Sequence, residues 1–191
     1  MLISTSNALM KTDYNTFIQD LAEKNQTTGE NKSDAYINYT QLSARRMKRW
    51  DKVGKLLPET IAAINNITQK QKWVVLTESW CGDAAHAYMF IQKMADLNEN
   101  IELEWKLRDE NLGLMDQYLT NGGRSIPKLI AFDEHQNELF NWGPRPKHIQ
   151  EAYLKMREEN LPYDELSVEL QKLYNADKGE SMQKELLKLM S

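Results

Sequence analysis

The spacing of apolar residues divides the chain into a helical beginning, a mixed centre and a helical tail. In the first part, apolar side chains recur every three or four positions at Tyr14, Phe17, Ile18 and Leu21. A polar stretch around Gly29 interrupts this pattern, and a second helical pattern follows over residues 34–53. Residues 1–53 are therefore predicted to be mainly helical and polar on the surface.

The centre alternates strand-like and helical patterns. A short apolar run, Trp73 to Leu76, predicts a buried strand, and a helix with an apolar stripe from Ala84 to Ala95 follows it. Apolar and charged residues alternate from Ile101 to Leu107, which is typical of an edge strand with one wet face. Further along, the pattern predicts a helix over residues 112–119 that ends at two glycines. It then predicts a strand pair over 128–132 and 138–142, followed by a helix that begins at a proline.

This order of elements predicts an α/β fold: a mixed sheet of about four strands with helices on both faces. Strands separated by helices favour parallel pairing, whereas the short connection between the last two strands favours an antiparallel hairpin. The tail contains two short amphipathic patterns, one after Pro162 and one after Gly179. We therefore divide the chain into an N-terminal helical extension (1–55), a central domain (56–160) and a C-terminal helical extension (161–191).

Composition narrows the classes of function. The 191 residues carry a formal net charge of −4, which disfavours a nucleic-acid binder, and 41% of them are hydrophobic, which is typical of a globular chain. No apolar run is long enough for a membrane helix, and the first residues lack the pattern of a signal peptide. We expect a cytoplasmic protein without a membrane partner; the sequence leaves its oligomeric state open.

The single cysteine, Cys81, lies where the first predicted strand turns into a helix. Free N–H groups and the helix dipole at that end favour a thiolate and lower the thiol pKa. The negative charge of Asp83 acts in the opposite direction. We expect a modestly lowered pKa, with the Asp83 carboxylate turned toward water. One cysteine excludes an intrachain disulfide and a multi-cysteine zinc site, and we expect no metal and no cofactor.

Three segments resemble the thioredoxin family. The stretch from Val74 to Ala84, with Trp80-Cys81-Gly82 at its centre, is similar to the active-site segment of that family. The stretch from Gly123 to Phe132 is similar to the loop and strand that carry its cis-proline, and Trp142-Gly143 is similar to the turn before its last helix. The matches occur in the family's order and cover about residues 56–160.

The resemblance implies roles for particular residues. Cys81 would be the attacking thiolate, and Pro127 would be the cis-proline that faces it. The backbone of Ile126 would pair with an extended substrate strand, as in strand addition. The remaining residues expected to bind substrate are Trp80, Gly82, Asp83 and Gly143.

The chain also departs from the family pattern. Ala84 stands where the family has its second, resolving cysteine, and Val75 stands where many members have a buried aspartate. A mixed disulfide on Cys81 would therefore persist until an outside thiol attacked it. The sequence predicts monothiol thiol-disulfide exchange with a protein or a low-molecular-weight thiol or disulfide. The alternatives are a non-catalytic module that binds peptides or proteins, and a structural or dimerisation role for the helical flanks.

Two groups of basic residues remain open to interpretation. The cluster at Arg45, Arg46, Lys48 and Arg49 is either a solvated helix face or a docking surface for an acidic partner. Arg124 and Arg145 flank the predicted active-site loops, where they either hold the carboxylates of a small thiol or are solvated. The three histidines are expected to lie at the surface.

Overall fold

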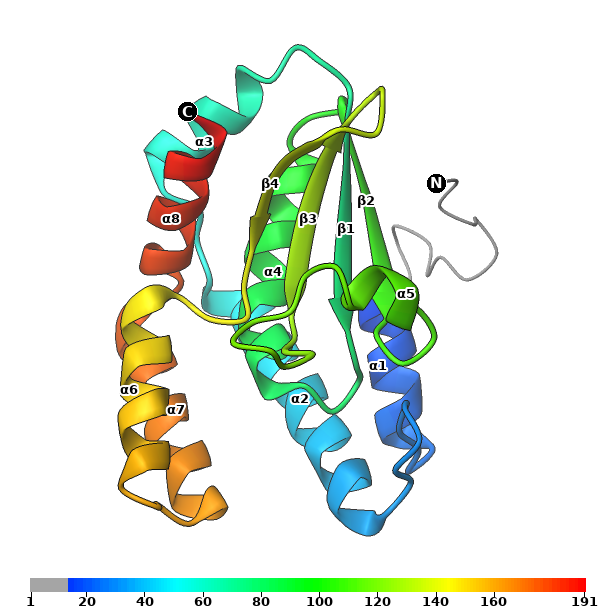
Figure 1. The fold of residues 1–191 in the computed structure, drawn as a ribbon, viewed down its shortest axis with the longest axis vertical. Helices are drawn as coiled ribbons and strands as arrows, with labels where there is room; N and C mark the ends of the chain where they lie inside the picture. Colours follow the sequence, from blue (N-terminus) through cyan, green and yellow to red (C-terminus); the bar gives the residue numbers. More distant parts are fainter. Residues whose placement is uncertain (1–13) are drawn as a thin grey trace.

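The computed structural model describes residues 14–191, so the part of the predicted N-terminal extension before Tyr14 lies outside the described residues. The chain forms eight helices and four strands within this range (Figure 1). In chain order they are α1 (Tyr14–Glu23), α2 (Asp34–Val53), α3 (Pro58–Asn65), β1 (Gln71–Thr77), α4 (Gly82–Asp96), β2 (Ile101–Leu107), α5 (Leu112–Met115), β3 (Lys128–Asp133), β4 (Glu138–Trp142), α6 (Lys147–Glu158), α7 (Tyr163–Asp177) and α8 (Glu180–Met190).

The four strands form one mixed sheet in the order β2-β1-β3-β4. Strand β2 runs parallel to β1 and lies at one edge, as its alternating sequence predicts. Strand β3 pairs antiparallel with β1, with Trp73 opposite Ala131, and antiparallel with β4. The expectation of parallel pairing is thus right for β1 and β2 but wrong for β3, because the chain between β2 and β3 contains only one helical turn and returns β3 to the other side of β1 in the opposite direction.

A large apolar core lies on one face of the sheet, around α4. Side chains from β1, β2 and β3 pack there against α4, and both terminal extensions contribute to the same core, through Ile18 of α1, Trp50 of α2 and Leu186 of α8. Each of these side chains is at least 98% buried. The extensions are therefore integral to the packing of the central sheet, since the apolar faces of amphipathic helices are stable only when covered.

The opposite face carries a smaller apolar cluster under α5 and the loop that precedes β3. It contains alternate residues of β1 and β3, together with Cys81, Met115 and Ile126. Helix α5 ends at Met115, earlier than the helical pattern over residues 112–119 predicts. The chain then forms turns up to a short bridge between Thr120 and Gly123, because backbone bonds such as that from the Tyr118 N–H to the Met115 carbonyl span only three residues.

Helices α6 and α7 lie side by side as a helical pair beside the sheet (Figure 1). Few residues of this pair are buried: Ile149 in α6, and Leu166 and Tyr174 in α7. The attachment of the pair to the rest of the molecule therefore depends largely on a few side-chain contacts. Helix α8 then returns to pack against α3 and β4. Its buried Gln183 accepts a hydrogen bond from the Leu57 N–H and donates one to the Lys55 carbonyl, which fixes the start of α3.

The described residues include no helix that is both long enough and apolar enough to cross a lipid bilayer.

Candidate functional site

Cys81 is the N-cap residue of α4 and directly follows the turn at Ser79 and Trp80 that comes after β1. Its Sγ atom accepts a hydrogen bond from the Ala84 N–H at 3.4 Å, as expected for a side chain at a helix N-terminus. The thiol in turn donates to the Ile126 carbonyl at 3.4 Å. The residue is only 6% exposed, so the sulfur faces the smaller apolar cluster and not the solvent.

This environment raises the pKa of the Cys81 thiol to about 12. Burial is the largest cause and the charge of Asp83 is the second, while the Ala84 N–H and Arg145 act in the opposite direction without compensating. The expectation of a lowered pKa is therefore wrong. Two backbone amide groups cannot replace the water that a thiolate would lose on burial in this apolar cluster.

The loop before β3 lies directly against Cys81. The peptide bond between Ile126 and Pro127 is cis, and both residues are buried. Gly143 lies behind this loop with a φ angle of +117°, and a Cβ atom on it would be 2.2 Å from the Pro127 carbonyl oxygen. The structure thus brings Cys81, Ile126, Pro127 and Gly143 together, but in a closed arrangement in which the Ile126 carbonyl already accepts the thiol hydrogen.

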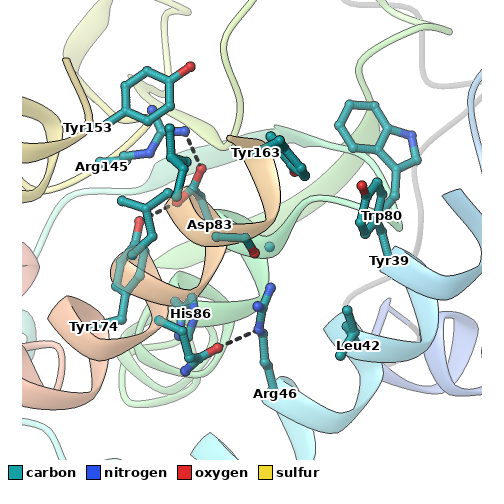
Figure 2. A pocket seen from close by; sticks show the side chains of 15 residues that line it. Tyr39, Leu42, Arg46, Trp80, Asp83, His86, Arg145, Tyr153, Tyr163 and Tyr174 are labelled. Carbon is teal, nitrogen blue, oxygen red and sulfur yellow. Dashed lines mark hydrogen bonds and ion pairs between the residues drawn. The ribbon is translucent and has the colours of Figure 1, made fainter. Parts of the chain in front are cut away.

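Asp83 turns away from the sulfur toward α6 and α7. Its carboxylate forms an ion pair with Arg145 at 2.7 Å and accepts a hydrogen bond from the Tyr174 hydroxyl at 2.7 Å (Figure 2). The side chains of Asp83 and Arg145 are each only 13% exposed. The expectation that this carboxylate rotates into water is wrong, because Arg145 in the turn before α6 supplies a positive charge and Tyr174 of the C-terminal extension supplies a hydroxyl.

Arg145 has a dense set of partners. Its guanidinium lies 4.0 Å above the Tyr153 ring centroid and donates to the Gln150 side chain. Its Nε atom is buried and has no hydrogen-bond partner among residues 14–191. Arg124, by contrast, lies at the surface in an ion pair with Asp116 at 2.6 Å. Of these two arginines only Arg145 lies beside the candidate site.

A pocket of about 120 Å³ lies between α2, the N-terminus of α4, and α7 (Figure 2). Its lining combines tyrosines with charged residues. Trp80, Gly82 and Asp83 belong to it, whereas Cys81 does not. The lining also includes Tyr39, Arg46, His86, Arg145, Tyr163 and Tyr174. The predicted site residues are therefore divided between two places. Cys81, Ile126, Pro127 and Gly143 form the closed thiol side, and Trp80, Gly82 and Asp83 line the pocket.

Arg46 lines this pocket from α2. Its Nε atom donates to the Gln171 side chain at 2.6 Å, and its guanidinium lies so close to Gly82 that a Cβ atom there would be 2.4 Å from Nη1. Burial lowers the pKa of Arg46, and the charge of Asp83 partly offsets this effect. Arg46 thus occupies the space beside Gly82, a residue that was expected to bind substrate.

His86 lines the pocket and is buried, although a surface position was expected. Its Nδ1 atom accepts a hydrogen bond from the Trp50 indole at 2.8 Å, and its ring stacks on Tyr174 at 4.1 Å. Burial, followed by the charges of Arg46 and Arg49, holds its pKa well below the usual range. A neutral His86 therefore links α2, α4 and α7 by packing and hydrogen bonding.

A buried polar cluster attaches the loop between α1 and α2 to the end of β1. The Glu78 carboxylate accepts hydrogen bonds from the Thr28 hydroxyl at 2.5 Å and from the Asp109 N–H at 2.9 Å. The Ser79 N–H donates to the Thr28 hydroxyl, and the Thr40 hydroxyl bonds to the Ser79 hydroxyl. Burial raises the pKa of Glu78. This cluster fixes the backbone just before Cys81, and sequence analysis missed it.

Sequence analysis also missed the residues that the extensions bring to the site. Tyr174 is 91 residues from the Asp83 that it contacts, and Gln171 is 125 residues from Arg46. The only sequence signal for these contacts was the basic cluster that contains Arg46, because arginines often form hydrogen bonds with polar groups of a neighbouring element. In the part of the chain that the structure describes, no group of three or more His, Cys, Asp or Glu side chains is placed to hold a metal ion.

The sheet, the cysteine at the start of α4 and the cis-proline loop together define a protein of thioredoxin-like fold. A family model described as thioredoxin matches residues 29–161, which is well over half of the chain. The chain therefore belongs to the thioredoxin family. The match includes α2 and ends just before α7.

Solved structures with the same fold differ widely from this chain in sequence. The crystal structure of an HIV epitope scaffold is 17% identical, with a TM-score of 0.58, and the match covers 93% of this chain and 91% of the scaffold. A protein of unknown function from Pseudomonas aeruginosa is 20% identical, with a TM-score of 0.50, and the match covers 75% of this chain and 86% of that protein. At these identities the likeness shows the fold alone. Comparison with curated proteins gave no match.

Proposed function

We propose that this chain is a thioredoxin-fold module that binds a protein or peptide partner without thiol-disulfide chemistry, and that Cys81 is a structural residue. The observation that carries this proposal is the state of the thiol. Its sulfur is buried, its hydrogen is donated to the Ile126 carbonyl, and its pKa is raised to about 12. A buried cysteine of this kind behaves as a small apolar side chain.

Thiol-disulfide exchange requires a thiolate that can reach a disulfide along the S–S axis. With a pKa of about 12, roughly one Cys81 side chain in 10⁵ is ionised at pH 7, compared with a few per cent of free cysteines. The chain has no second cysteine that could release a trapped substrate, because Ala84 occupies that position. Both properties favour binding over catalysis.

One observation favours a second candidate, monothiol exchange. Cys81 and the cis-proline loop are adjacent, with the sulfur 3.4 Å from the Ile126 carbonyl oxygen. If the loop moved away, the ionised sulfur would attack one sulfur of a disulfide, form a mixed disulfide and release the other sulfur as a thiolate. An outside thiolate would then attack the mixed disulfide and restore the Cys81 thiolate.

Two experiments separate these candidates. First, wild type and Cys81→Ala are incubated with oxidised glutathione, folded or in denaturant, and their intact masses are measured. We expect a glutathione adduct on the unfolded wild type only; an adduct on the folded wild type would establish exchange. Second, partners captured from a lysate are compared without reductant. Binding predicts the same non-covalent partners for both chains, whereas exchange predicts mixed disulfides that depend on Cys81.

A further inference from the structure

A second, wider groove continues outward from the pocket between α2 and α7. It encloses about 630 Å³ and is lined by Leu42, Arg45, Arg46, Arg49, Ser167, Val168, Gln171, Lys172 and Asn175. Leu42, Arg46, Ser167 and Gln171 also line the pocket, so the two hollows are continuous. Four of the lining residues are basic and none is acidic, although the whole chain has a net charge of −4.

The α2 side of the groove arises from a regular helical pattern. Leu42, Arg45, Arg46 and Arg49 occupy positions i, i+3, i+4 and i+7, which places them on one face of α2 over two turns. That face is turned toward α7. It is the same basic cluster whose role the sequence left open between a solvated surface and a docking surface.

The arginines of the groove bond mainly to neutral groups. Arg45 donates to the Gln41 carbonyl, Arg46 to the Gln171 side chain, and Arg49 to the Asn175 side chain. Within residues 14–191, no carboxylate lies within 4.0 Å of Arg45 or Arg49, so no ion pair neutralises these two exposed charges. Lys172 differs, because it pairs with Glu169 at 2.7 Å.

The same hydrogen bonds connect the two walls of the groove. Arg46–Gln171 and Arg49–Asn175 connect α2 to α7, and the Tyr39 and Tyr163 rings meet edge to face at 5.7 Å. A site held by existing contacts loses less conformational freedom when a ligand binds.

Aliphatic side chains lie among these charges. Leu42 from α2 is 38% exposed and Val168 from α7 is 54% exposed. A segment that carries both carboxylates and aliphatic side chains would pair with the arginines and cover Leu42 and Val168 at the same time. A phosphate backbone or a lipid headgroup would pair with the arginines but leave these aliphatic groups in water.

We propose that the α2–α7 groove is the docking surface for an acidic peptide segment with interspersed aliphatic residues, contributed by a partner protein. This inference rests on the proposed binding function and names the chemical class of its partner. The carboxylates of the segment pair with Arg45 and Arg49, and its aliphatic side chains pack on Leu42 and Val168. The basic face of α2 extends over two helical turns, or about 11 Å, so a short peptide segment is long enough to span it.

Fluorescence anisotropy with a labelled peptide of three Glu-Glu-Leu repeats tests this inference on the full chain. The comparison peptide has Gln in place of every Glu. The groove variant is Arg45→Glu/Arg49→Glu, and the matched control is Lys155→Glu/Arg157→Glu, which makes the same charge change on exposed residues of α6. A neutral variant, Arg45→Gln/Arg49→Gln, replaces the groove variant if that variant fails to fold by circular dichroism.

We expect the Glu peptide to bind wild type, with affinity that falls as salt rises. The groove variant should bind it at least tenfold more weakly and the control within about twofold, and the Gln peptide should bind wild type at least tenfold more weakly. Equal loss in both variants, or no binding of the Glu peptide, would overturn the inference. So would groove-dependent binding of a single-stranded oligonucleotide or of anionic vesicles in its place, or groove-dependent self-association in sedimentation.

The same preparations distinguish failure of this inference from failure of the proposed function. If the peptide result is negative while folded Cys81 stays free of glutathione, only the identity of the partner is wrong. If folded Cys81 forms the glutathione adduct, the proposed function is wrong regardless of the peptide result.

Discussion

The two sides of the N-terminus of α4 differ in almost every physical property. On one side Cys81 and the cis-proline loop form a closed apolar contact, with the thiol hydrogen bonded to the Ile126 carbonyl. On the other side Asp83, Arg46 and their partners line a pocket that opens into a basic groove. The backbone arrangement typical of a thiol site, a cysteine at a helix N-terminus facing a cis-proline loop, is present. The accessible polar side chains lie on the opposite side, in a pocket lined mostly by residues of the terminal extensions.

The closed side should be the most sensitive to added volume. Gly143→Ala places a Cβ atom 2.2 Å from the Pro127 carbonyl oxygen at a φ angle of +117°, so we expect a loss of more than about 3 kcal/mol in the free energy of unfolding. Gly122→Ala is the control, because Gly122 also has a positive φ angle but no described atom lies within 4 Å of the added group; this substitution should cost about 1 kcal/mol. Urea denaturation measures both, and similar losses would show that the loop is not tightly packed.

The pocket side should depend on its buried ion pair. Asp83→Asn leaves the Arg145 charge without a counterion, and we expect a loss of about 2–3 kcal/mol. The control is Asp116→Asn, which breaks the ion pair with Arg124 in which both side chains are about half exposed; it should cost less than about 1 kcal/mol. Thermal and urea unfolding give the comparison. Equal costs would mean that solvent screens the Asp83–Arg145 pair.

The pH dependence of stability reports the state of the thiol. The pKa of Cys81 is about 12 in the folded chain and about 8.5 in the unfolded chain, so the unfolded state loses its proton first as pH rises. The stabilisation from the protonated thiol is complete below about pH 8.5 and is lost as pH approaches 12. Between pH 7 and 10, wild type should lose about 2 kcal/mol relative to Cys81→Ala.

The difference between these two chains is the informative quantity, because the tyrosines with raised pKa values are present in both and their contributions cancel. A constant difference from pH 7 to 10 would show that folding does not raise the pKa of the thiol.

Of the regions compared, the groove should show the smallest change in stability when its exposed arginines are substituted. Arg45→Gln/Arg49→Gln removes two exposed charges whose hydrogen bonds go to neutral groups, and we expect a change of less than about 1 kcal/mol in the free energy of unfolding. The same substitutions should weaken binding of the acidic peptide. A loss well above about 1 kcal/mol would contradict this expectation and show that the Arg49–Asn175 bond contributes strongly to the packing of α2 against α7.

Most of the fold was predictable because its signals are local. The alternation from Ile101 to Leu107 predicted an edge strand, and the pattern from Glu138 to Trp142 predicted the last strand of a hairpin; the structure confirms both. The length of α5 was not predictable in this way, because the apolar residues after Met115 stay at helical spacing although the chain forms turns. The antiparallel pairing of β3 with β1 depends on long-range packing, which the sequence pattern does not carry.

The candidate site was predictable only in part. The motif around Cys81 and the loop at Pro127 identified the backbone arrangement of the site, but the pKa of the thiol depends on its burial in the smaller apolar cluster, which no local pattern reports. The partners of Asp83 come from α7 and from the turn before α6, and a single sequence gives no signal for such contacts. This is why the resemblance predicted a reactive thiol where the structure has a buried one.

The rate at which iodoacetamide alkylates Cys81, followed from pH 6 to 11 in the folded protein and in the chain unfolded by urea, measures the accessibility and ionisation of the sulfur together. Because burial suppresses both, we expect the folded protein to react at least about 100-fold more slowly at pH 8 than the unfolded chain, with no midpoint below about pH 10. A folded protein that reacts as fast as the unfolded chain, or with a midpoint near pH 7, would contradict a structural role for Cys81 and establish a reactive thiol.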